Sequence, residues 1–137
     1  MNTPKIKLQR EEDLSRFLQL HHFHVEDLGE NVLRVQREDE LPVFLKVDEA
    51  QIYFEVDLGN VDEVATIEFY ATLLDLNTEV LPVSFGLDTS NPEDVRLVLV
   101  ESRETGDLCD DEILAVFDAL ELAVDRAQEV MTQALNR

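Results

Sequence analysis

Three histidines lie within four residues of one another, and they are the first candidates for chemistry in this chain. The segment is His21-His22-Phe23-His24. Histidine is the commonest metal-binding side chain, so this spacing suits a transition metal such as zinc. No cysteine and no H-E-x-x-H pattern lies nearby, and metal sites usually take their ligands from separate elements. We therefore predict a helix-end cluster that binds no metal. A metal-dependent protein or enzyme using His21, His22 and His24 is the alternative.

The single cysteine is the next candidate, as a nucleophile. A nucleophilic thiol needs a neighbouring base or cation, whereas Cys109 stands among Asp107, Asp110, Asp111 and Glu112. We predict an inert thiol where a helix begins. One cysteine cannot form a disulfide within the chain, and this favours a reducing compartment, so we expect a cytoplasmic protein.

Acidic side chains are too numerous for any pair of them to indicate catalysis. The chain has 31 aspartates and glutamates, so close carboxylate pairs arise by chance. The turn-rich stretch 88–94 lacks the ligand spacing of a calcium-binding loop. The sequence also lacks the G-x-G-x-x-G, G-x-x-x-x-G-K-[ST] and G-x-S-x-G motifs. We therefore predict no catalytic residue and no cofactor.

The charge balance limits the partners. Eleven basic against 31 acidic residues give a net charge of −20, which repels the phosphates of DNA and RNA and the surface of an anionic membrane. We expect no nucleic-acid binding and no membrane insertion, since no long apolar segment occurs. An acidic surface that imitates a nucleic acid in a basic protein site is a further alternative.

Length and composition predict a single folded domain over residues 1–137. A hydrophobic content of 45% argues against disorder despite the many charges. A domain of this size buries about two thirds of the surface of its unfolded chain, so it needs no disulfide or metal for stability. We expect residues 1–9 to form a loosely ordered tail.

The first half of the chain predicts a helix and three strands. Leu14, Phe17, Leu18 and His21 have the spacing of one helical face. Residues 23–25 suggest a short extended piece. Three apolar segments, at 32–37, 41–47 and 51–57, then read as strands. Their short polar links predict an antiparallel meander, because parallel strands need a long crossover.

A second helix is predicted from Asn60 to about Leu76, with Asn60 and Glu63 forming a capping box and Asn77 as the stop signal. Two sets of apolar residues lie along it. We expect the first set to cover the sheet and the second to point partly elsewhere. The first set is Val64, Ile67, Ala71 and Leu74. The second set is Phe69, Tyr70 and Leu73.

The last part of the chain predicts a hairpin and the longest helix. Residues 81–87 and 95–101 read as its two strands, and a helix runs from Asp110 to about Ala134. An apolar seam follows that helix, and we expect it to pack on the sheet of the same molecule rather than between subunits. The predicted class is α+β, in the order α-βββ-α-ββ-α. The seam is Ile113, Phe117, Leu120, Val124, Ala127, Met131 and Ala134.

Two Leu-Pro strands on either side of the second helix support a family resemblance. They are Leu41-Pro42-Val43-Phe44-Leu45 and Leu81-Pro82-Val83-Ser84-Phe85-Gly86. With the acidic composition, they make the chain resemble the bacterial YjfI-like family over residues 30–135. The resemblance implies a domain similar to the type III secretion chaperone fold, in a family often encoded near PspA-like membrane-stress proteins.

The resemblance also implies a function. Chaperones of that fold are small, acidic homodimers that hold an extended segment of a client protein. We therefore expect a non-enzymatic, chaperone-like protein-interaction module, with a PspA-like protein among the candidate partners. We also expect a homodimer whose interface includes Phe69, Tyr70 and Leu73, because these side chains would leave an apolar patch exposed in a monomer.

Overall fold

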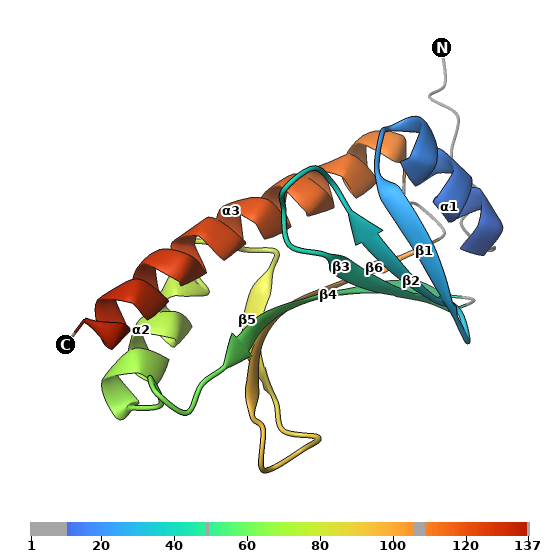
Figure 1. Ribbon diagram of the computed structural model, residues 1–137. Coiled ribbons are helices and arrows are strands. Elements are labelled where there is room, and N and C mark those ends of the chain that lie inside the picture. The colour runs from blue at the N-terminus through green and yellow to red at the C-terminus, as the bar shows by residue number, and fades with distance from the viewer. Residues whose placement is uncertain (1–10, 49, 106–108, 137) are drawn as a thin grey trace.

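The computed structural model describes residues 11–48, 50–105 and 109–136, in which three helices accompany a sheet (Figure 1). The predicted tail at residues 1–9 lies outside this part of the chain. The elements, in chain order, are α1 (Glu11–Leu20), β1 (His24–Gly29), β2 (Val32–Gln36), β3 (Val43–Val47), β4 (Gln51–Asn60), α2 (Ile67–Leu76), β5 (Ser84–Asp88), β6 (Arg96–Glu104) and α3 (Asp110–Leu135).

The strands form one sheet in the order β1-β2-β3-β4-β6-β5, and every neighbouring pair is antiparallel. The predicted α+β class, the meander and the hairpin of β5 and β6 are therefore confirmed. The structure adds one strand, β1, at the edge of the sheet. Its sequence does not show the apolar alternation of a half-buried strand, because most of its side chains are exposed. Glu30 and Asn31 join it to β2 with φ of 54° and 64°, as tight hairpin turns require.

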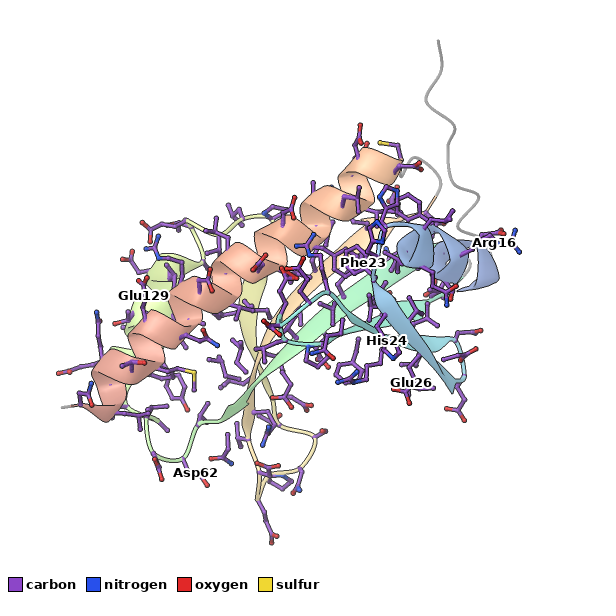
Figure 2. The ribbon with its side chains drawn as sticks, turned by 45° about the horizontal axis from the view of Figure 1, so that its top comes forward. Arg16, Phe23, His24, Glu26, Asp62 and Glu129 are labelled. Carbon is purple, nitrogen blue, oxygen red and sulfur yellow. The ribbon has the colours of Figure 1, made fainter. Side chains whose placement is uncertain are left out.

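The first helix packs as its spacing predicts at three of the four positions, whereas His21 lies beyond the end of the helix at Leu20 and is exposed. Leu14, Phe17 and Leu18 are all buried. The helix ends where His22 adopts a φ of 69°, and the amide of Phe23 donates to the carbonyl of Leu18 at 3.0 Å. This turn directs Phe23 into the core, where Figure 2 places it between α1 and α3.

The predicted start of the second helix is wrong. Helix α2 begins at Ile67, after Thr66, whose hydroxyl accepts from the amide of Phe69 at 3.0 Å. The side chain of Asn60 instead accepts from the amide of Asp62 and donates to Asp94, so it holds a turn against the next hairpin. The predicted stop is confirmed, since Asn77 is the C-cap.

Within α2 the two apolar faces are also the reverse of the prediction, although Val64, which precedes the helix, is buried as expected. Phe69, Leu73 and Leu76 are buried, and Phe69 and Leu73 pack in a cluster that contains Leu97 of β6. Ile67 is 87% exposed and Leu74 is 68% exposed. Both faces are apolar, so helical spacing alone could not choose between them. In the fold, the face with the larger phenylalanine side chain is the one buried.

Helix α3 runs across the sheet, with α1 on the same side (Figure 1). Its seam is buried from Ile113 to Ala127, which confirms packing on the sheet. Toward its C-terminus, Met131 and Ala134 contact the cluster that holds α2. No helix in the described ranges combines the length and the apolar character that crossing a membrane requires.

Candidate functional site

The three histidines of the cluster do not come together in the described structure. His21, His22 and His24 are all exposed. The ring of His21 lies 4.5 Å from that of Phe17, whereas His24 lies on β1 (Figure 2). Over residues 11–48, 50–105 and 109–136, no three histidine, cysteine or acidic side chains come together in a way that could hold a metal ion.

Cys109 is half-buried and is the N-cap residue of α3. Its Sγ lies 3.4 Å from Oε1 of Glu112, one turn into the helix. The contact is a weak hydrogen bond in which the thiol donates. This geometry matches the predicted thiol at a helix start, and the group that the thiol contacts is a carboxylate rather than a cation.

The face of the sheet opposite α1 and α3 is uncovered in the described structure, and we call it the open face (Figure 1). Alternate side chains of each strand point to it. The strand registers place them in two rows. One row is Arg34, Phe44, Glu55, Val100 and Ser84; the other is Lys46, Tyr53 and Ser102.

A hollow of about 740 Å³ lies on the open face. Phe44, Tyr53 and Val100 give it an apolar surface, and Tyr53 and Val100 are 44% and 37% exposed. Side chains of this kind are normally buried in a core or in an interface. The hollow is therefore a candidate surface for binding another molecule. Sequence reasoning missed it, although the exposed Lys46 and Tyr53 between apolar neighbours mark the outward positions.

Charges of both signs lie around the hollow. Lys46 lies on the β3 side and Glu55 on β4. Burial raises the pKa of Glu55 above its usual value, and the neighbouring carboxylates of Asp88 and Asp57 add to this effect. A carboxyl group with a raised pKa gains from a nearby cation. Glu55 is thus a position where a basic group of a partner would be favoured.

The hollow reaches an unpaired edge of β6. Strand β5 begins at Ser84 opposite Val100, so within the described residues β6 has no strand partner on that side from Glu101 to Glu104. Before Ser84 the chain turns, with the amide of Val83 donating to the carbonyl of Val80 at 3.1 Å. Unpaired strand backbone of this kind is a template for an added strand.

Glu101, at this edge, is a buried carboxylate. Its Oε1 accepts from Nε of Arg103 at 2.8 Å, while its Oε2 has no hydrogen-bond partner in the described structure. Burial raises the pKa of Glu101, and the charge of Arg103 acts in the opposite direction. Its register partner on β4 is the buried Phe54, so the side chain lies on the helix-covered face rather than in the hollow.

A second apolar depression, which we call the α2–β5 pocket, lies between helix α2 and strand β5. It has a volume of about 310 Å³, and Tyr70, Leu74, Phe85 and Leu87 line it. The predicted interface residues differ in exposure: Tyr70 is half-buried in the pocket wall, Leu73 also lines the pocket but is buried, and Phe69 is buried within the chain.

The sequence of this chain matches a known protein family, and its fold matches that of known structures. The model of the CesT_Tir_1 family matches residues 8–136. None of the curated proteins matches the sequence. A chain in the heterodimeric complex ExoU-SpcU from the type III secretion system of Pseudomonas aeruginosa has 21% identity and a TM-score of 0.69. That match covers 85% of this chain and 96% of the other.

Two further structures have the same fold. YbjN from E. coli has 16% identity and a TM-score of 0.63, with 93% of this chain and 90% of YbjN covered. An uncharacterized protein from Methanothermobacter thermautotrophicus has 15% identity and a TM-score of 0.66, with coverages of 93% and 97%. At these identities the structures establish the shared fold, and the predicted similarity to type III secretion chaperones is confirmed at that level.

Proposed function

The chain belongs to the CesT_Tir_1 family, and on that premise we propose that it is a non-enzymatic protein-interaction module that holds a segment of another protein. The observation that carries the proposal is the position of the apolar hollow beside the unpaired edge of β6. A similar structure is that of a chain in a heterodimeric secretion complex, so a protein of this fold occurs bound to another protein.

An extended segment of the partner suits this site. It would pair its backbone with the free groups of β6 beyond Val100, as in strand addition to a sheet edge. Apolar side chains of the partner would then lie against Tyr53 and Phe44 in the hollow. The backbone pairing supplies affinity, and the side-chain contacts supply specificity.

The partner and the compartment are part of the same proposal. We propose a cytoplasmic protein, because a single cysteine suits a reducing compartment. A PspA-like protein is the first partner to test, on the strength of the resemblance to the YjfI-like family. That narrower resemblance stays a prediction.

We further propose a homodimer that pairs two copies at the α2–β5 pocket. Leu74 and Leu87 are large exposed apolar side chains that line it, and Tyr70 lies in its wall. Ile67, one helical turn before Tyr70 on α2, is exposed as well. A twofold contact would bury the same patch on both copies. Phe69 and Leu73 support this surface from beneath.

The test is co-purification from native lysate with a matched pair of variants. Tyr53→Glu/Val100→Glu places two charges on the open face, and Leu122→Glu/Leu20→Glu places two on exposed helix positions elsewhere. We expect the wild type and the helix variant to recover the same partner and the open-face variant to lose it. Recovery of no partner, or of the same partner by all three proteins, overturns the proposal.

Salt distinguishes this binding from imitation of a nucleic acid. An interface built on apolar contacts and backbone pairing survives washing in about 0.5 M salt, whereas attraction between the acidic surface and a basic protein is screened. We expect the complex to survive the wash. Complete dissociation would favour the nucleic-acid mimic.

A further inference from the structure

A third depression, which we call the acidic notch, lies on the helix-covered side where the loop between β2 and β3 meets α3. Its volume is about 270 Å³. The base of the notch is apolar, since five core side chains reach it from β3, β4 and α3. They are Val43, Val56, Phe117, Leu120 and Val124. The notch thus brings solvent to the edge of the hydrophobic core.

Carboxylates surround this apolar base. Glu38, Asp39 and Glu40 approach it from the loop, and Glu121 and Asp125 from α3. The remaining lining residues are Leu41 and Gln128, so none of the described residues that line the notch is basic. An apolar base with an acidic opening has the polarity of one kind of side chain, an aliphatic stem that ends in a cation.

Arg37 lies near the notch and pairs with only some of its carboxylates. Arg37 binds Glu40 at 2.8 Å and reaches Asp118 and Glu121 at 3.1 and 3.4 Å. In the described chain, Asp39 and Asp125 have no ion-pair partner. The hydrogen bond between Glu121 and Glu40 raises the pKa of Glu121, and burial and the charge of Glu40 add to the effect. Negative charge is therefore in excess at the notch.

We propose that the acidic notch binds an arginine or lysine side chain of a protein partner. The aliphatic stem lies against Leu120 and Val124, and the charged end lies among the carboxylates of Asp39, Glu121 and Asp125. The complementarity of charge selects this occupant over an acidic or a neutral side chain. The inference rests on the proposed protein-binding role and deepens it, because it names the chemistry of a contact away from the open face.

The experiment needs no natural partner. The wild-type protein, with its methyl groups labelled for NMR, is titrated with N-acetyl-arginine methylamide. N-acetyl-norleucine methylamide serves as the uncharged control. We expect saturable shifts of the Val43, Leu120 and Val124 methyl signals with the arginine probe, and shifts at least about tenfold weaker with the norleucine probe. Equal shifts with both probes, or no shifts at these methyls, overturn the proposal.

Two matched double variants distinguish binding at a local site from attraction by the overall negative charge of the protein. Asp39→Lys/Asp125→Lys changes exposed positions at the notch, and Asp62→Lys/Glu129→Lys changes exposed positions before α2 and late in α3 (Figure 2). Each raises the net charge by four. We expect the first variant alone to lose the arginine response. Equal loss in both variants contradicts a local site, and unshifted spectra elsewhere confirm folding.

The result of the arginine titration does not depend on whether the open face binds a partner. If the arginine probe binds the notch but no partner is recovered from lysate, the proposed function fails and the notch stands. If a partner binds through the open face and the probe does not bind, the notch alone is overturned.

Discussion

The guanidinium of Arg37 lies over the ring of Phe23, with 5.3 Å between Cζ and the ring centroid. The same guanidinium binds Glu40 in the loop after β2 and Asp118 on α3. Phe23 in turn contacts the ring of Phe117, with 4.7 Å between the centroids. One side chain therefore joins the segment after α1, the loop after β2 and helix α3.

Changing Arg37 to Met should destabilise the fold by about 1–2 kcal/mol. Methionine keeps the apolar stem over Phe23 but leaves Glu40 and Glu121 close together without a cation. Urea unfolding near neutral pH measures the change. Arg37→Lys is the control, and it should recover part of the loss, because an ammonium lacks the planar fork of a guanidinium.

Lowering the pH should reduce the difference in unfolding free energy between the wild type and Arg37→Met. Burial by itself raises the pKa of Glu40, but the hydrogen bonds with Arg37 and Glu121 outweigh it and leave the pKa below its usual value. A lowered pKa contributes stability above the unfolded value and loses it as the pH falls through the folded value. The wild type and Arg37→Met should therefore converge in stability below about pH 4. A constant difference would contradict the ion-pair explanation.

Phe117→Ala should cost about 3–5 kcal/mol of unfolding free energy. Phe117 packs edge-to-face on Phe54 of β4, with 5.8 Å between the centroids, and also contacts Phe23. The truncation therefore opens a cavity between α3, the sheet and the end of α1. Phe117→Leu, which keeps most of the volume, should cost less than half as much in the same denaturation experiment.

Glu55→Gln should make the protein more stable near neutral pH. Burial and the neighbouring Asp88 and Asp57 raise the pKa of Glu55, so the folded state binds a proton more tightly than the unfolded state. Stability then falls as the pH rises above the usual carboxyl value, and glutamine removes this penalty. The gain should vanish as the pH falls below the usual carboxyl value, because Glu55 then binds a proton in both states. A gain that is independent of pH would contradict the cause given.

Wild-type protein at micromolar concentration should elute as a dimer, near twice the chain mass of 15.7 kDa. Ile67→Glu/Leu74→Glu should give a folded monomer, because both side chains are exposed beside the α2–β5 pocket. Leu73→Glu should unfold the protein instead, since Leu73 is buried. Size-exclusion chromatography with light scattering measures the mass. A wild-type monomer would contradict the dimer, and Leu122→Glu is the control.

Purified protein should contain no stoichiometric zinc. His21 and His22 are exposed in the turn after α1 and His24 is exposed on β1, and no three potential ligands come together in the described residues. Metal analysis after purification without a histidine tag checks this. Zinc at one equivalent that disappears in His22→Ala/His24→Ala would establish the metal alternative.

The sequence by itself determined the fold class and most of the elements. The seam from Ile113 onward predicted α3, and the alternation at Ile52, Phe54 and Val56 predicted β4, since these patterns follow directly from helix and strand geometry. The short links between strands determined that the sheet is antiparallel. Only a short extended piece at 23–25 was expected where β1 runs from His24 to Gly29, because the exposed polar residues of this strand carry no apolar alternation.

Tertiary structure decided which surfaces stay open. Ile67 and Phe69 are both apolar, and only packing against Leu97 buries one and exposes the other. The open face depends on strand register and on α1 and α3 packing on the same side of the sheet. The acidic notch joins Asp39 to Asp125, which are distant in the sequence, and local patterns carry no information about such pairs. Sequence periodicity indicates which residues can be buried, whereas the packing of whole elements against one another determines which of them remain exposed.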